Sequence, residues 1–409
     1  MIDKYQSTAE TLVNKITDEV VSTLREKTNP RAIILKGSFG RDEPSLIITH
    51  DNHVKFISDY EIELISLTFL VNRILNKKYQ PILADISSEY NLKIDIGGLK
   101  LSIYHQLPLM YRTLHPTIAN YDLKYGSKVI YGEDILKQIP QFKPEEIPLY
   151  EGLKLLCNRI AEAHRYFEIE YISKGLSEED EDNLFFWTNK IILACQDLLL
   201  IYNHNYHQSY KYRNDIFKSI FPTEFSDLHK KIPYFLPLAI SATNYKLDPN
   251  QRYSTDVIDL WFKVRDIVGG TLELVLKKDS RITQQYCQYN TDEVLEQFNE
   301  HIQQQKILPT IKQNFIVIAK YWINNSKLLP LRTIRNLSKN WTLMVYYYIL
   351  CLYFCPKRDG AIDYKKLAEI SQLLDIIVEH KDLEKFTYER PQWVTLKHRG
   401  LHYWRTMCY

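Results

Sequence analysis

Two short segments near the start of the chain hold residue types whose spacing is suited to chemistry. In Leu35-Lys36-Gly37-Ser38-Phe39-Gly40-Arg41, a hydrophobic run ends in Gly-Ser. In Ser58-Asp59-Tyr60-Glu61-Ile62, two carboxylates stand two positions apart. Alternate residues of a strand point to the same face. Asp59 and Glu61 are therefore expected to project side by side, while their apolar neighbours point into the protein.

A divalent cation would relieve the repulsion between two such carboxylates, and hard oxygen ligands favour Mg²⁺, with Mn²⁺ as an alternative. Asp95 stands in a second apolar run, Leu92-Lys93-Ile94-Asp95-Ile96. If that run is a strand beside the first, Asp95 joins the site. Three carboxylates can hold two ions, one that activates an attacking oxygen and one that orients a triphosphate. The predicted catalytic and metal residues are thus Asp59, Glu61 and Asp95.

Gly37 and Ser38 occupy the turn that leaves the first strand. Glycine permits close backbone approach, and the serine hydroxyl and backbone N–H can donate to phosphate oxygens. Arg41 follows three residues later and is suited to a bidentate phosphate contact. The predicted nucleotide-binding residues are Gly37, Ser38 and Arg41. The alternative for Arg41 is an ion pair with Asp42 or Glu43, and the alternative for the carboxylates is an ordinary solvent-facing strand.

The elements that must position these residues follow from hydrophobic periodicity. Apolar residues recur at steps of three and four over 5–24, which predicts an amphipathic helix ended by Asn29-Pro30. Alternating or β-branched runs predict strands at 32–36, 59–65, 92–96 and 128–131, a hairpin formed by 45–49 and 54–57 around residues 50–53, and a helix at 67–75. The order predicts a small mixed sheet with flanking helices, an α+β module.

Beyond Pro140 the patterns are helical, with helices predicted at 184–202, 257–276, 311–323, 341–354 and 364–378. Pro144 and Pro148 mark a linker, and a break is expected near 289–291. We therefore predict three domains: a catalytic module at 1–140, a helical domain at 145–288 and a C-terminal helical domain at 291–409. The overall fold class is α+β, with a large all-helical region after the sheet.

The Gly-Ser turn, the following Asp-x-Glu and the later lone Asp resemble the motifs of the DNA polymerase β-like nucleotidyltransferase superfamily. The stretch Gly37-Ser-Phe-Gly-Arg-Asp-Glu-Pro-Ser45 and the segment 121–132 look like uncharacterised prokaryotic members of that group. The resemblance covers roughly residues 30 to 135. It implies transfer of a nucleoside monophosphate from an NTP to a hydroxyl or phosphate acceptor, with release of pyrophosphate. ATP is the NTP that we expect.

Two departures stand out. The interval from Ser38 to Asp59 is longer than in most of the superfamily, and Glu61 stands where Asp is commoner. The sequence names no acceptor: a small molecule, a protein and RNA all stay open. The alternative function is a catalytically inactive member of the fold that binds a nucleotide or acts as a protein-interaction scaffold.

Composition limits the partners. The 52 basic and 50 acidic residues nearly cancel, so net charge does not indicate a general nucleic-acid binder. Six cysteines without metal-ligand spacing predict free thiols in a reducing cytoplasm. The apolar run 341–355 is shorter than a membrane span, and residues 1–10 are polar, so we expect a cytoplasmic protein without a membrane partner. The basic, aromatic tail from Arg390 suits either an anionic acceptor or docking onto the helices.

Overall fold

The computed structural model describes residues 2–48, 53–65, 79–97, 115–276, 295, 296, 298, 341–363 and 392–408. The chain divides into two compact units. The first contains residues 1–151, 203–219 and 240–253, and the second contains 152–202, 220–239 and 254–409. The predicted hairpin turn at 50–52, the helix at 67–75, the break near 289–291 and the helices at 311–323 and 364–378 lie outside the described residues. The three-domain division stays a prediction.

The first unit is built on a small mixed sheet, as the sequence predicts. Its four strands lie in the order β5-β4-β1-β6. β1 (Ala32–Leu35) is antiparallel to both β4 (Tyr60–Ile65) and β6 (Lys128–Gly132), whereas β4 and β5 (Ile94–Gly97) are parallel. β2 (Leu46–Ile48) and β3 (Val54–Phe56) form the predicted hairpin as a separate two-stranded sheet.

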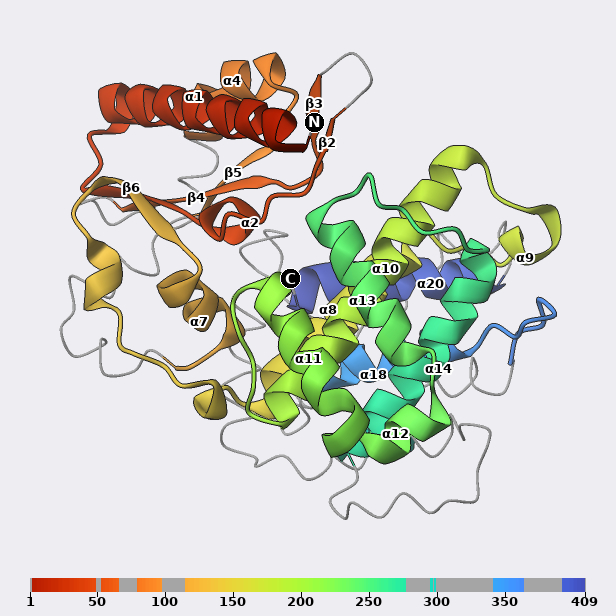
Figure 1. Ribbon diagram of the computed structural model, residues 1–409. Coiled ribbons are helices and arrows are strands. Elements are labelled where there is room, and N and C mark those ends of the chain that lie inside the picture. Colours follow the sequence, from red (N-terminus) through yellow and green to blue (C-terminus); the bar gives the residue numbers. More distant parts are fainter. Residues whose placement is uncertain are drawn as a thin grey trace, which may run out of the picture. The chain divides into compact units, whose positions relative to one another are not determined.

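Helix α1 (Ile2–Thr28) covers one face of this sheet (Figure 1). Its buried residues Ile16, Val20 and Leu24 pack with Tyr60 and Ile62 of β4. Burying this apolar surface stabilises the unit by roughly 25 cal/mol per Å². Because strand residues alternate, the opposite face of β4 carries Glu61 and Glu63.

Short elements complete the first unit. The turn α2 (Gly37–Gly40) follows β1 directly, and α7 (Ile118–Tyr125) precedes β6. The others are η1 (Gln80–Leu83), α4 (Ala84–Glu89), η2 (Ile135–Gln138) and η3 (Pro144–Glu146).

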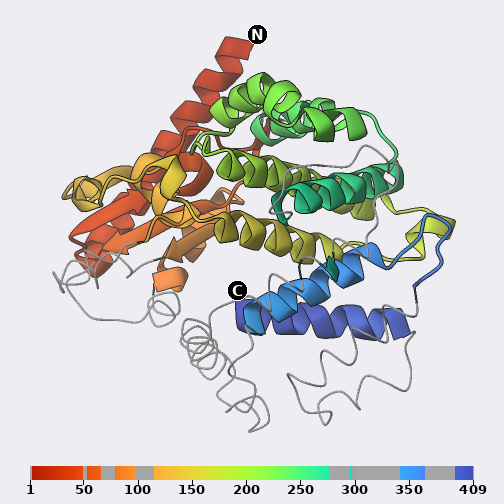
Figure 2. The ribbon, with the colours of Figure 1, turned by 90° about the horizontal axis from the view of Figure 1, so that it is seen from below.

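The remaining described elements are helical, as expected: α8 (Leu149–His164), α9 (Tyr171–Lys174), α10 (Glu178–Tyr202), α11 (Tyr210–Glu224), α12 (Ser226–Lys231), α13 (Phe235–Leu247), α14 (Val257–Leu276), α18 (Trp341–Phe354), α20 (Gln392–Tyr403) and the π-turn η6 (Trp404–Cys408). α18 and α20 lie side by side in the second unit (Figure 2).

One described helix, α10, is long and apolar enough to cross a membrane by length and composition. However, 83% of its most apolar window is buried inside the protein, against neighbours that include α14. Burial of this kind is typical of a core helix. The shorter run at 341–354 is also a buried helix, as predicted.

Candidate active site

The Gly37-Ser38 turn depends on glycine for two independent reasons. Gly37 has φ +63°, in the left-handed region that L side chains rarely adopt. A Cβ atom at this position would also lie 2.6 Å from Glu61 Oε1, closer than any real contact. The carboxylate of Glu61 is therefore packed against the turn, and Ser38, the next residue, is buried. The two segments singled out in the sequence meet at this point.

The pairing of β4 with β5 brings the third predicted carboxylate to the site. Glu61 and Asp95 are direct neighbours in the parallel register, so their side chains share one face of the sheet. Asp59 lies immediately before β4, which begins at Tyr60, one residue later than predicted. Asp59, Glu61 and Asp95 thus lie at one end of two adjacent strands, and their assignment as one site stays a prediction.

Lys93 lies between two of these carboxylates. Its Nζ atom donates to Asp59 Oδ2 at 2.6 Å and to Asp95 Oδ2 at 2.7 Å. Burial lowers the pKa of Lys93, but the hydrogen bonds to the two aspartates raise it by more. The pKa of Lys93 is therefore above its usual value. About half of each aspartate side chain is exposed. The pair is therefore open to solvent, with an ammonium group as its shared counter-ion.

A second lysine is held more firmly on the same face. Lys36 Nζ lies 2.8 Å from Glu63 Oε2, and Glu63 is buried. Burial lowers the pKa of Lys36, but Glu63, and more weakly Glu61 and Asp95, raise it above its usual value. Loss of Lys36 would leave the Glu63 carboxylate uncompensated in a buried position, at a cost of about 3–5 kcal/mol. This ion pair fixes the end of β1 against β4.

The oxygen ligands on this face are of the chemical type that binds a divalent cation. The face carries four carboxylates, Asp59, Glu61, Glu63 and Asp95, against two ammonium groups, which leaves a net charge of −2. Carboxylate oxygens are the ligands that Mg²⁺ prefers. Within the described ranges, however, no three carboxylate, imidazole or thiol groups lie close enough together to hold an ion in the present arrangement. Asp59 and Asp95 are instead joined through Lys93.

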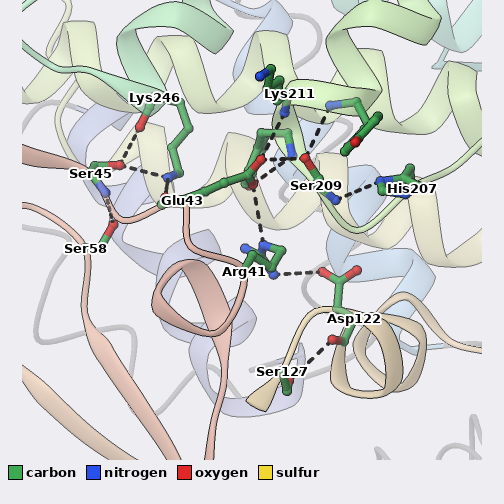
Figure 3. A network of polar contacts seen from close by, with 12 residues as sticks. Arg41, Glu43, Ser45, Ser58, Asp122, Ser127, His207, Ser209, Lys211 and Lys246 are labelled. Atoms are coloured by element: carbon green, nitrogen blue, oxygen red, sulfur yellow. Dashed lines mark hydrogen bonds and ion pairs between the residues drawn. The ribbon is translucent and has the colours of Figure 1, made fainter. Parts of the chain in front are cut away.

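Arg41 is ion-paired, with Glu43, one of the two partners that the sequence left open, and with Asp122, which it did not predict; Asp42, the other expected partner, pairs with Lys128. Its Nη1 atom lies 3.4 Å from Asp122 Oδ2 and its Nε atom 3.9 Å from Glu43 Oε2, with only 10% of the side chain exposed (Figure 3). Its guanidinium also stacks 5.6 Å from the ring centre of Tyr210. These contacts position the loop after the turn and give no support to a phosphate contact, which stays a prediction.

Glu43 anchors the same loop within the first unit. Its carboxylate accepts hydrogen bonds from Ser209 Oγ at 2.5 Å and from the backbone N–H groups of Tyr210 and Lys211 at the start of α11 (Figure 3). A carboxylate at a helix N-terminus satisfies backbone donors that otherwise lack partners. Lys246 Nζ donates to Glu43 O at 3.0 Å and to Ser45 Oγ at 2.8 Å.

Sequence reasoning missed Lys93, the Lys36–Glu63 pair and the contacts of Glu43 at the start of α11. Lys93 had a readable signal, because it stands two positions before Asp95 in an alternating run and so shares its face. Lys36 and Glu63 had none, since their contact joins residues on different strands. The contacts of Glu43 join it to residues more than 160 positions away.

Two residues elsewhere in the chain that could bind a ligand, His207 and Lys397, have structural partners. His207 Nδ1 accepts from the backbone N–H of Ser209 at 3.1 Å, and burial lowers its pKa. Lys397 of the basic tail is buried and pairs with Glu168, so this part of the tail docks within the helical unit. That unit has its own open cleft of about 410 Å³, lined in part by Tyr171, Asp259, Phe262 and Arg358, and none of the predicted site residues line it.

Comparison of the chain with protein families, with characterised proteins and with solved structures found no match.

Proposed function

We propose that this protein is a metal-dependent nucleotidyltransferase, which transfers a nucleoside monophosphate from an NTP to a hydroxyl or phosphate acceptor and releases pyrophosphate. One observation carries the proposal. The left-handed Gly37 turn lies against Glu61, and Glu61 lies in register with Asp95 on a neighbouring parallel strand. A phosphate-binding turn and a group of carboxylates at the same strand ends are the two parts that this chemistry requires.

The chain's own residues divide the work as follows. Asp59, Glu61 and Asp95 would hold Mg²⁺, which when bound neutralises triphosphate charge and lowers the pKa of an attacking oxygen. Backbone N–H groups of the turn at Gly37 and Ser38 would donate to phosphate oxygens. Asp95, about half exposed, is suited to accept the proton of an incoming hydroxyl. The ion pair of Lys36 with buried Glu63 keeps β1 and β4 in fixed register beneath these groups.

A second candidate function is favoured by Lys93. Because its ammonium already bridges Asp59 and Asp95, the two aspartates share a counter-ion without any bound cation. A catalytically inactive protein that binds a nucleotide, or acts as a scaffold, is compatible with this arrangement. The two candidates differ in one measurable property, which is whether nucleotide binding and turnover depend on a divalent cation and on Asp59.

The test uses the full chain with each of the four [α-³²P]NTPs, with Mg²⁺ or with a chelator. We expect Mg²⁺-dependent pyrophosphate release or transfer of label, and a loss of at least about a hundredfold in Asp59→Asn, in the range found when a group that stabilises transition-state charge is removed. Calorimetry with a non-hydrolysable ATP analogue measures binding separately from turnover.

Asp85→Asn is the matched control, because it removes the same charge from an exposed position in α4 of the same unit. It should leave activity and binding unchanged. Nucleotide binding that ignores both Mg²⁺ and Asp59→Asn would support the inactive alternative. Absence of any NTP binding would overturn the site assignment itself.

A further inference from the structure

The flexible side chain of Lys93 lies where a cation would have to bind. Lys93 Nζ contacts one oxygen of Asp59 and one of Asp95, at 2.6 and 2.7 Å. It stands outside the regular strand, directly before β5, and 62% of its side chain is exposed. Lysine is a compact point charge on a flexible four-carbon stem. Lys93 can therefore leave the aspartates without any rearrangement of the sheet.

Lys36 does not have this freedom. Its Nζ is committed to buried Glu63, and only 26% of its side chain is exposed. Removal of Lys36 would leave the buried Glu63 carboxylate without its counter-ion. Of the two ammonium groups described on this face, Lys93 is thus the exchangeable one and Lys36 the structural one.

An ammonium group and a divalent cation compete for the same oxygens. When Lys93 is in place, it occupies Oδ2 of both aspartates and adds a positive charge within about 4 Å of any ion bound between them, which opposes binding. When it leaves, the face loses a positive charge and attracts a divalent cation more strongly. An incoming triphosphate offers an alternative anionic partner for the released ammonium.

We propose that Lys93 is an exchangeable internal counter-ion, which holds Asp59 and Asp95 together in the cation-free protein and must be displaced before a divalent cation binds. This inference rests on the proposed function only in taking these two aspartates as cation ligands. It adds a positioning residue that sets the cation affinity of the site.

The experiment titrates Mn²⁺ into the nucleotide-free protein and follows free Mn²⁺ by electron paramagnetic resonance, with Mg²⁺ as competitor. In Lys93→Met we expect Mn²⁺ to bind about tenfold more tightly than in the wild type, since a nearby opposing charge has been removed. Lys93→Arg retains the charge and should bind Mn²⁺ no more tightly than the wild type. Lys137→Met removes an equal charge from an exposed pair with Asp134 and should have no effect.

A second measurement separates displacement from simple loss of a surface charge. In the presence of a chelator, Lys93→Met should melt at a lower temperature than the wild type, because Asp59 and Asp95 then face each other without a counter-ion. Saturating Mg²⁺ should raise its melting temperature by more than that of the wild type.

Equal Mn²⁺ affinity in Lys93→Met and the wild type would overturn the inference while leaving the cation site intact. Weaker binding in Lys93→Met would also overturn it, since Lys93 would then support the site. Failure of every variant to bind Mn²⁺ would overturn the cation site of the proposed function together with the inference.

Discussion

At the scale of single residues, the site depends on how closely backbone and carboxylate approach each other. Gly37 combines a positive φ with a side-chain neighbour, Glu61, that fills the space where a Cβ would lie. The two effects have different origins. The first is a conformational cost of about 1 kcal/mol for a non-glycine residue, and the second is a steric clash that Glu61 must relieve by moving.

We therefore predict that Gly37→Ala destabilises the protein by about 2–3 kcal/mol and displaces the Glu61 carboxylate. Gly360→Ala is the matched control, because Gly360 has φ +82° and a Cβ there meets nothing within 4 Å. It should cost only the conformational part. Urea unfolding of both variants, and of Gly37→Ala combined with Glu61→Ala, measures the difference. If the two single variants lose equal stability, Glu61 does not crowd the turn.

The residues that sequence could predict are those whose neighbours are close in the chain. The placement of Asp59, Glu61 and Asp95 could be predicted because strand alternation fixes the face to which each belongs. The partners of those residues were harder to find, since a pair such as Lys36 and Glu63 forms only after β1 and β4 align. Local pattern predicts which groups share a face, and tertiary pairing decides which of them neutralise each other.

At the scale of elements, four helices of the second unit meet around one buried histidine. His164 of α8 is fully buried and lies 5.7 Å from the ring centres of both Trp261 of α14 and Tyr353 of α18. Trp393 of α20 completes the contact at 6.3 Å. Neither ring nitrogen of His164 has a hydrogen-bond partner among the described residues. Burial, and secondarily the charge of Lys397, lowers its pKa to about 3.

This lowered pKa predicts acid sensitivity of the helix packing. Below about pH 6.5 the unfolded chain protonates this histidine, whereas the folded protein does so only near pH 3. The free energy of unfolding should therefore fall by about 1.4 kcal/mol per pH unit across that window. Urea unfolding from about pH 7 to about pH 4 measures the slope, with pH values spanning the window.

The slope should be smaller in His164→Phe, which keeps the ring and removes the titrating group. His402→Gln removes an exposed histidine of α20 and should keep the wild-type slope. A slope that is the same in all three proteins would show that other groups govern the acid response.

Helix periodicity predicted α14 and α18, together with α10, but it did not predict the helix α20 or the meeting point around His164. The apolar runs at 184–202, 257–276 and 341–354 read as helices from spacing alone, and the structure confirms each. Nothing in the spacing tells which helices pack together, because every apolar stripe can pair with any other. The contact of α8 with α20 around His164 joins residues more than 200 positions apart.

At the scale of the whole molecule, the chain leaves the first unit and returns to it twice. Residues 203–219 and 240–253 belong to the same compact unit as residues 1–151, although helical segments of the second unit come between them in sequence. The returning segments supply Ser209, Tyr210 and Lys246, which hold Glu43 and Ser45 after the Gly-Ser turn. They also supply Tyr206, whose hydroxyl donates to Asp122 Oδ1 at 3.1 Å.

This path predicts that residues 1–151 alone do not hold the site as the full chain does. The truncated chain leaves Glu43, whose side chain is only 10% exposed, without the donors of α11, at about 1–3 kcal/mol for each unsatisfied buried group. Hydrogen–deuterium exchange in the truncated chain should be faster in β1, α2 and the following loop than in the full protein.

The same contacts can be tested in the full chain. Ser209→Ala combined with Lys246→Met removes the same side-chain contacts and should speed exchange at the loop. The control pair Lys218→Met with Ser219→Ala, which lies exposed in α11, should not. Equal protection in the truncated and full chains would mean that the sheet alone fixes the turn, which would favour the predicted module boundary near residue 140.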